Sequence, residues 1–434
     1  MHTYLVRALW VGALVVATLV VPGLARADVI SDWNAIAQAE TVPLRPTAHG
    51  QMRGMAMVEG AVYDAVNAID RGHSSYLLDP SSVGAQPWAS QDAAAATAAY
   101  RVLKALTPAA RHAGLDAAYA STRASIPDGA IEDEGVQAGE AAAAAMLAAR
   151  AGDGFMAPFT PVIGSSPGNW RPLGWPATPS LDPDGYVGNL TPFLINSPSQ
   201  FRSEGPNALT SRAYAEEFAE VKEIGALNSS TRTADQTAAA VFWQAAPIAL
   251  FNRVARELAA RYELDTSDQA RLYASMNMAG ADGAISCWSD KYRHMFWRPR
   301  AAIREADTDG NPATVADPSW EPLFHPSTAT TPPIATPPFP DHPSGHGCVS
   351  GAILHAMTDF FGTDRVAFTV VSSRSLNGAP IAPRRFERFS QATKEIVDAR
   401  VWGGIHFRTA DVQGTVIGKK VANWLRKHYF RPVG

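Results

Sequence analysis

Alanine-rich helical periodicity dominates this chain and leaves little room for a sheet. Across residues 28–245, apolar residues recur at the spacing that places them on one face of a helix, and alternating strand patterns hardly occur. Residues 93–106 and 140–151 consist of strong helix formers. With 46% hydrophobic residues among 434, the chain can also bury a large core. We therefore expect an all-α protein.

Two stretches rich in proline and glycine, 152–206 and 308–343, interrupt the helical pattern and are expected to be long packed loops. Helical periodicity returns at 211–225, 231–245, 249–261, 267–294, 344–361 and 389 to about 425. This order predicts two packed helical bundles, 28–245 and 246–434, with the functional residues in the second.

Residues 1–27 have the layout of a secretory signal peptide. Arg7 is the basic residue, residues 8–21 form an apolar stretch, and Ala-Arg-Ala at 25–27 is a small-residue cleavage site. The apolar stretch is shorter than the about 20 residues that a helix needs to cross a bilayer. We expect a periplasmic or secreted protein without a stable membrane anchor after signal cleavage; a retained N-terminal anchor is the alternative.

Charge and cysteine content exclude several classes of protein. A net charge of −4 and the lack of a dense Lys/Arg run argue against a nucleic-acid partner. Two cysteines, Cys287 and Cys348, are too few for a disulfide-rich scaffold or for a metal site made of cysteines alone. A disulfide between them and two buried free thiols are both open interpretations.

Three segments in the second half carry residues suited to binding an oxyanion. In the first, Lys291 and Arg298 are seven residues apart, which is two helical turns, so both cations are expected on one face. Pro299 is expected to end that helix behind Arg298. A solvated stripe of cations is the alternative for this segment by itself.

The second segment, residues 339–347, reads Phe-Pro-Asp-His-Pro-Ser-Gly-His-Gly and runs into an apolar helix. Ser344, Gly345 and His346 should therefore lie at a helix N-terminus, where unpaired backbone N–H groups can bind an anion. Glycine lets the backbone come close to a ligand. A simple serine N-cap is the alternative.

The third segment places Arg400 and His406 six residues apart, which on a continuous helix separates them by about 120°. Gly403 and Gly404 between them each cost about 1 kcal/mol relative to alanine in a helix. Close approach of another helix or of a ligand best explains that cost. A histidine that is simply buried in the core is the alternative for His406.

Together these segments predict a site for a tetrahedral oxyanion, with one histidine to bind or attack it and another to move protons. Their content and order resemble the signature of the vanadium-dependent haloperoxidase and type 2 phosphatidic acid phosphatase superfamily. The similarity to bacterial vanadium chloroperoxidase-like proteins extends to residues 53–70, 168–172, 232–243 and 336–340.

This resemblance implies a role for each residue in a haloperoxidase. Vanadate would be the cofactor, and His406 would be the metal ligand that bonds vanadium. The vanadate oxygens would be held by Lys291, Arg298, Ser344, Gly345 and Arg400. His346 would accept a proton from hydrogen peroxide, and Lys291 would polarise the bound peroxide.

The resemblance also implies the reaction, which is oxidation of halide by hydrogen peroxide to hypohalous acid, with a small organic acceptor taking the halogen. Trp288 and Phe339 match family positions of the halide pocket, although a hydrophobic core would contain both as well. An acid phosphatase is the alternative, in which His406 would form a phosphohistidine and His346 would protonate the leaving group of a phosphate ester. A noncatalytic oxyanion-binding protein is a further alternative.

Two positions depart from the family pattern. Ala399 stands where the family often has serine, and Ala410 stands where a carboxylate often supports the acid–base histidine. Asp411 follows directly and would replace that carboxylate after a small helix shift. These departures bear on halogenating activity more than on vanadate binding.

Overall fold

The computed structural model describes residues 28–41, 48–172 and 181–433. The predicted signal peptide, residues 1–27, lies outside the described residues, so export stays a prediction. Within the described part of the chain, no helix is both long enough and apolar enough to cross a membrane.

Helices make up most of the described chain, which confirms the predicted all-α class. The first helices are α1 (Val29–Thr41), α2 (Ala48–Asp70), α3 (Pro80–Val83), α4 (Gln91–Leu106), α5 (His112–Ala124) and α6 (Ala130–Arg150). They are followed by α7 (Arg212–Ile224), α8 (Ala234–Phe242), α9 (Pro247–Arg261), α10 (Thr266–His294) and α11 (Pro299–Arg304). The last are α12 (Gly345–Phe361), α13 (Phe389–Trp402) and α14 (Arg408–His428), and short 3-10 helices are η2 (Ala109–Arg111), η3 (Gly185–Asn189) and η4 (Ala306–Thr308).

Short strands form two small antiparallel sheets, which the sequence pattern did not predict. One sheet has the order β1 (Thr330–Thr331), β3 (Ser375–Leu376) and β4 (Ala379–Pro380), and the other pairs β2 (Phe368–Val370) with β5 (Arg384–Phe386). Strands of two or three residues are too short to show an alternating pattern.

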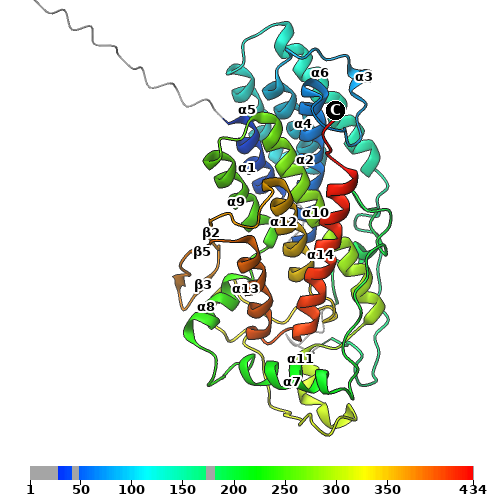
Figure 1. Ribbon diagram of the computed structural model, residues 1–434, viewed down its shortest axis with the longest axis vertical. Helices are drawn as coiled ribbons and strands as arrows, with labels where there is room; N and C mark the ends of the chain where they lie inside the picture. The colour runs from blue at the N-terminus through cyan, green and yellow to red at the C-terminus, as the bar shows by residue number, and fades with distance from the viewer. Residues whose placement is uncertain (1–27, 42–47, 173–180, 434) are drawn as a thin grey trace, which may run out of the picture.

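The long helices α10, α12 and α14 run side by side through the middle of the molecule (Figure 1). Helix α2 packs against α10, helices α4 and α6 pack against α2, and α7, α8 and α11 lie towards the other end of the molecule. A continuous hydrophobic core includes residues of α2, α4, α10, α12 and α14. This core includes residues on both sides of the predicted division at residues 245 and 246, and the division stays a prediction.

Several helices begin where a capping residue indicates. The side chains of Ser211, Thr233 and Asp265 accept hydrogen bonds from backbone N–H groups in the first turns of α7, α8 and α10. The segments 211–225 and 267–294 are therefore helical as predicted, with ends shifted by one residue.

The last predicted helix, 389 to about 425, is wrong as a single element. The chain forms α13 and α14 instead, with a link between Trp402 and Arg408. Gly404 in this link has a φ of 72°, a left-handed conformation that a right-handed helix does not contain. Two adjacent glycines thus mark a break in the helix.

Glycine allows α12 and α14 to pack unusually closely. A Cβ atom at Gly418 would lie only 2.3 Å from the carbonyl oxygen of Cys348. At the start of both helices, the Ser344 N–H donates to the Ala410 carbonyl at 2.9 Å. This contact brings the second predicted segment next to the residues that follow the third.

Cys287 and Cys348 are both buried, and both are free thiols. The disulfide interpretation is therefore wrong, and the alternative of two buried thiols is confirmed. Cys287 Sγ donates a weak hydrogen bond to the Pro343 carbonyl at 3.6 Å.

Glu59 of α2 makes the stability of the fold depend on pH. Burial raises the pKa of Glu59 to about 8, although the Asn34 hydrogen bond and the Arg256 charge lower it. Since the folded state binds the proton more tightly than the unfolded chain, this stabilisation is complete below about pH 4.5 and is lost as the pH rises through about 8. Each unit of pKa difference is worth about 1.4 kcal/mol.

We predict that Glu59→Gln flattens the fall in the free energy of unfolding over this interval, measured by urea denaturation at a series of pH values. The exposed Glu257→Gln on α9 is the control and should keep the wild-type profile. An unchanged profile in the Glu59→Gln variant would show that this carboxyl group titrates alike in both states.

Candidate functional site

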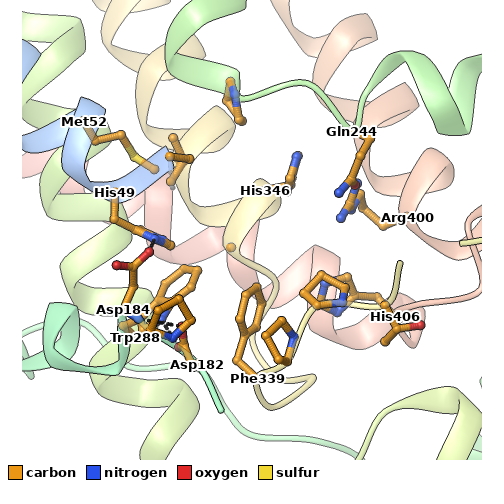
Figure 2. Close-up of a pocket in the computed structure, with 18 of the residues that line it drawn as sticks. His49, Met52, Asp182, Asp184, Gln244, Trp288, Phe339, His346, Arg400 and His406 are labelled. Carbon is orange, nitrogen blue, oxygen red and sulfur yellow. Dashed lines mark hydrogen bonds and ion pairs between the residues drawn. The ribbon is translucent and has the colours of Figure 1, made fainter. Parts of the chain in front are cut away.

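A cavity of about 340 Å³ lies where α10, α12 and the link between α13 and α14 meet (Figure 2). Six of the predicted site residues line it: Trp288, Phe339, Gly345, His346, Arg400 and His406. The other three, Lys291, Arg298 and Ser344, are buried but are not among its lining residues. Residues spread over more than a hundred positions are thus brought to one place.

Lys291 and Arg298 do not share a helix, contrary to the prediction. Helix α10 ends at His294 with Met295 in a left-handed conformation, and Arg298 is the N-cap of α11. Pro299 therefore begins a helix instead of ending one, because proline has no N–H to leave unpaired at the first helical position.

The Lys291 ammonium group is held by backbone carbonyls. Its Nζ donates to the carbonyl oxygens of Pro340 at 2.8 Å, Asp341 at 3.1 Å and Pro343 at 2.5 Å. Burial lowers the pKa of Lys291 to about 8. Lys291 thus fixes the segment that leads to Ser344, while its contact with an oxyanion or with peroxide stays a prediction.

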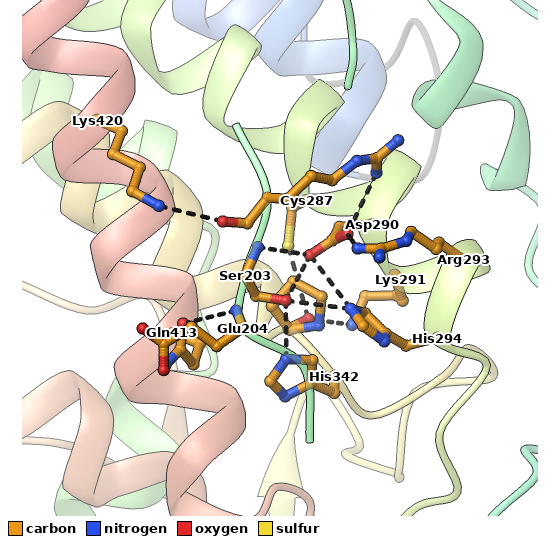
Figure 3. A network of polar contacts seen from close by, with 12 residues as sticks. Ser203, Glu204, Cys287, Asp290, Lys291, Arg293, His294, His342, Gln413 and Lys420 are labelled. Carbon is orange, nitrogen blue, oxygen red and sulfur yellow. Dashed lines mark hydrogen bonds and ion pairs between the residues drawn. The ribbon is translucent and has the colours of Figure 1, made fainter. Parts of the chain in front are cut away.

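A second polar network holds the same segment from another side (Figure 3). Ser203 Oγ donates to Asp290 Oδ2 at 2.5 Å. Because a hydroxyl has only one proton, His342 Nε2 must donate to Ser203 Oγ, at 3.0 Å. Burial lowers the pKa of His342 to about 3, so the ring is neutral. Of His342 and His346, the two histidines of the second segment, only His346 lines the cavity.

Ser344 caps α12, as one interpretation predicted. Its Oγ accepts the Gly347 N–H at 3.4 Å. Gly345 and His346 follow in the first turn and line the cavity, so the N-terminus of α12 opens onto it. A Cβ atom on Gly345 would lie 2.8 Å from the Trp288 ring, which leaves room only for glycine.

The third segment is a link between helices, so the predicted helical separation of Arg400 and His406 does not apply. The close approach expected at the glycines is present: a Cβ atom on Gly404 would lie 2.3 Å from the Gly225 carbonyl oxygen, and one on Gly403 would lie 2.9 Å from the Phe324 ring. The approaching group is therefore protein, and it turns the chain so that His406 reaches the cavity.

Both ring nitrogens of His406 have partners. Nδ1 lies 2.7 Å from Asp341 Oδ1, and Arg298 Nη1 lies 3.1 Å from Nε2 and 3.4 Å from Nδ1. Arg298 also donates from Nε to the Phe339 carbonyl at 2.8 Å and from Nη1 to the Ile405 carbonyl at 2.7 Å. Arg298 and Asp341 thus hold the imidazole between them.

Three buried nitrogen atoms, on residues that interact electrostatically with His406, have no hydrogen-bond partner among the described residues: Arg298 Nη2, Arg400 Nε and His346 Nε2. Buried polar atoms are nearly always paired in folded proteins. Burial lowers the pKa of Arg298 to about 10 and that of Arg400 to about 9, so both stay charged at neutral pH. Unpaired cationic donors beside a histidine fit a tetrahedral oxyanion such as vanadate or phosphate.

Several residues that shape the site carry no signal in the sequence. Besides Asp341, these are the cavity-lining residues His49, Asp182, Asp184 and Gln244. Gln244 Oε1 accepts from Arg400 Nη1 at 2.8 Å, and Asp182 Oδ2 accepts from Trp288 Nε1 at 2.8 Å. They come from separate parts of the chain, so no spacing relates them to the three segments.

The departures from the family pattern can now be located. Ala410 is buried, and the Asp411 carboxyl group is also buried, where burial raises its pKa to about 7 and the Ser344 side chain lowers it. His346 instead has the Ala245 carbonyl as a hydrogen-bond partner, and burial holds its pKa well below the usual range. The expected replacement of the missing carboxylate by Asp411 is therefore wrong.

We predict that Gly404→Ala destabilises the protein more than Gly362→Ala. Both glycines have positive φ, at 72° and 66°, and alanine there costs about 1–2 kcal/mol. Only at Gly404 would the added Cβ atom also meet backbone, whereas at Gly362 no atom lies within 4 Å. Thermal unfolding of both variants measures the difference; equal losses would mean that the link relaxes freely.

Comparison with known proteins agrees with this geometry. Residues 271–434 match the family model described as the VCPO second helical-bundle domain. The chain is 26% identical to the vanadium chloroperoxidase of Curvularia inaequalis, in an alignment that covers 51% of this chain and 45% of the relative. The chain thus spans about half the length of that relative.

Solved structures with the same fold include the first bacterial vanadium-dependent iodoperoxidase, with a TM-score of 0.75 and 22% identity over 94% of this chain and 98% of the other. An apo bacterial vanadium-dependent chloroperoxidase has a TM-score of 0.66 and 17% identity over 90% and 94%. Residues 271–434 therefore resemble the second helical-bundle domain of a vanadium chloroperoxidase in sequence, and the chain has the fold of the solved bacterial vanadium haloperoxidases.

Proposed function

We propose that this chain is an exported vanadate-dependent haloperoxidase that oxidises halide with hydrogen peroxide to hypohalous acid. The observation that carries the proposal is the group of buried, unpaired cationic donors on Arg298 and Arg400 beside His406. The match of residues 271–434 to a chloroperoxidase domain supports vanadate over other oxyanions.

Vanadate would be bonded by His406, with its oxygens held by Arg298, Arg400, Lys291, Ser344 and Gly345. Once bound, vanadate would supply Lewis acidity that makes a peroxide oxygen electrophilic. The three cations offset the negative charge of the oxyanion in a site from which water is largely excluded. Lys291 would turn part of its hydrogen bonding from the loop carbonyls to the peroxide.

His346 would act as the base that takes a proton from hydrogen peroxide. Burial and the Arg400 charge hold the pKa of His346 well below its usual range, so the ring is neutral and can accept a proton. Its Nε2 has no partner among the described residues, and the ring lines the cavity. The Ala245 carbonyl orients the ring through a hydrogen bond.

Halide would bind beside Trp288 and Phe339, whose ring centroids lie 5.1 Å apart in an edge-to-face arrangement. The Lys291 Nζ lies 5.5 and 5.2 Å from these two centroids, so positive potential reaches the pocket. In the overall reaction the halide gives two electrons to the peroxide, the O–O bond breaks, and one proton is consumed to give hypohalous acid and water. The hypohalous acid would then halogenate a small organic acceptor.

We predict that His406→Ala abolishes vanadate retention, whereas His346→Ala retains vanadate but loses turnover by about 10² to 10⁴-fold, the usual contribution of general acid–base catalysis. Retention is measured by equilibrium dialysis, and turnover by halogenation of monochlorodimedone with bromide and chloride and by triiodide formation with iodide. His355→Ala is the control, because His355 lies on the same helix as His346 without lining the cavity.

Equal vanadate retention in the His406 and His346 variants would contradict these roles. Failure of the wild type with all three halides, together with hydrolysis of p-nitrophenyl phosphate, would assign the site to a phosphatase. Tight oxyanion binding without either activity would assign it to a binding protein.

We predict that the exported protein begins at Asp28, because the proposed cleavage site ends at Ala27. Expression in a bacterial host, cell fractionation and N-terminal sequencing test this directly. Recovery of a chain that begins at Met1 from the membrane fraction would favour the retained anchor.

A further inference from the structure

We propose that Asp341 is a positioning residue that fixes the tautomer and the orientation of His406, so that Nε2 offers its lone pair to the bound oxyanion. This inference rests on the proposed function and deepens it, because a histidine can bond vanadium or attack phosphorus only through an unprotonated nitrogen.

The two residues meet although they are far apart in the chain. Asp341 lies on the segment before α12, and His406 lies in the link between α13 and α14. Asp341 Oδ1 is 2.7 Å from His406 Nδ1, and 0% of Asp341 and 2% of His406 are exposed. At that burial, water cannot replace the carboxylate as a partner of the ring.

Asp341 decides which ring nitrogen carries the proton. Arg298 Nη1 lies 3.1 Å from His406 Nε2 and 3.4 Å from Nδ1, and a guanidinium N–H can donate a hydrogen bond but cannot accept one. The ring partner that can accept is Asp341 Oδ1, beside Nδ1, so the proton of the neutral ring is on Nδ1. That proton is donated to Asp341 Oδ1, and this assignment holds whether or not Oδ2 is protonated.

The opposite tautomer would leave the ring proton without an acceptor. A proton on Nε2 would face the Arg298 N–H, and the Nδ1 lone pair would face the Asp341 oxygen. The buried hydrogen bond between the ring and Asp341 would be lost. Carboxylates commonly hold metal-binding histidines in this way, and losing such a partner typically weakens ligand binding by 10–100-fold.

Asp341 itself is anchored as firmly as the ring that it holds. Its N–H donates to the Phe296 carbonyl at 2.9 Å, and its carbonyl accepts from Lys291 Nζ at 3.1 Å. Arg298 Nη1 lies 3.9 Å from Asp341 Oδ1. The backbone of Asp341 is therefore held by Phe296 and Lys291, and the Arg298 charge lies close to its carboxyl group.

Charge and positioning predict different results, which makes the proposal easy to test. Burial raises the pKa of Asp341 well above its usual range, so by charge alone removing this carboxyl group should tighten vanadate binding if the group is ionised and leave it unchanged if the group is protonated. If Asp341 positions His406, its removal should weaken binding in either case. Asp411 is a matched control, because it is buried and interacts with Arg298 and Arg400 without contacting His406 in the described structure.

The experiment measures the vanadate dissociation constant of the purified protein by equilibrium dialysis. We expect Asp341→Ala to raise it by at least 10-fold, the lower end of the usual range for such a partner. Asp341→Asn keeps a carbonyl oxygen that can accept from Nδ1, and should recover most of the affinity. Asp411→Asn should bind vanadate as tightly as the wild type or more tightly. Equal affinity in the Asp341→Ala variant, or equal losses in the Asp341→Ala and Asp411→Asn variants, would overturn the proposal.

A second measurement needs no bound vanadate. Long-range ¹H–¹⁵N NMR of the ligand-free protein, with the His406 signals identified from their loss in His406→Ala, reports the tautomer directly. We expect the Nδ1–H form in the wild type and in Asp341→Asn, and a mixture in Asp341→Ala. The same tautomer in all three would overturn the proposal. A wild type that lacks haloperoxidase activity but shows these tautomers would refute the proposed function while leaving the role of Asp341 intact.

Discussion

Three buried positive charges organise the second half of this protein. Lys291, Arg298 and Arg400 are each no more than 1% exposed, and removing a cation from water is costly unless the protein supplies partners. Backbone carbonyls supply most of them. Three surround the Lys291 ammonium, and two more accept from Arg298.

Because backbone carbonyls provide these hydrogen bonds, the chain must pass close to the cations. The segment 339–343 provides four of the accepting carbonyls, so its irregular path, rich in proline, is determined by the need to solvate charge. The hydrogen bonding of the two arginines is incomplete, because Arg298 Nη2 and Arg400 Nε have no partner among the described residues. An oxyanion is the ligand that would complete the hydrogen bonding of these groups, which links the stability of the site to its proposed function.

Helix packing places the histidines at the open end of this arrangement. Close contact of α12 and α14 through Gly418 holds the Ser344 cap near the start of α14, and His346 follows in the first turn of α12. The break at Gly404 then directs His406 to the same cavity. Its two neighbours have opposite roles, since Arg298 can only donate to the ring and Asp341 can accept from it.

Much of the helical framework and six of the residues that line the cavity could be predicted because the information is local. Ser211 and Asp265 cap the helices that follow them, and the Ser344-Gly345-His346 motif lies at the helix start expected for it. The predictions failed where a helix had to break. Lys291 and Arg298 were expected on one helical face, but a proline at position 299 is compatible with the start of a helix as well as with its end.

The sequence by itself determined the helical class, the residue types of an oxyanion site and their order along the chain, because periodicity, capping and charge are properties of short segments. Only the tertiary structure decided that Asp341 holds His406, that Gln244 holds Arg400, and that Asp411 lies near Ser344 and not His346. Those pairings join segments 65 and 156 residues apart in the first two cases. They depend on the packing of the helices and on the hydrogen bonds of the buried cations, and the spacing of residues within a short segment does not predict them.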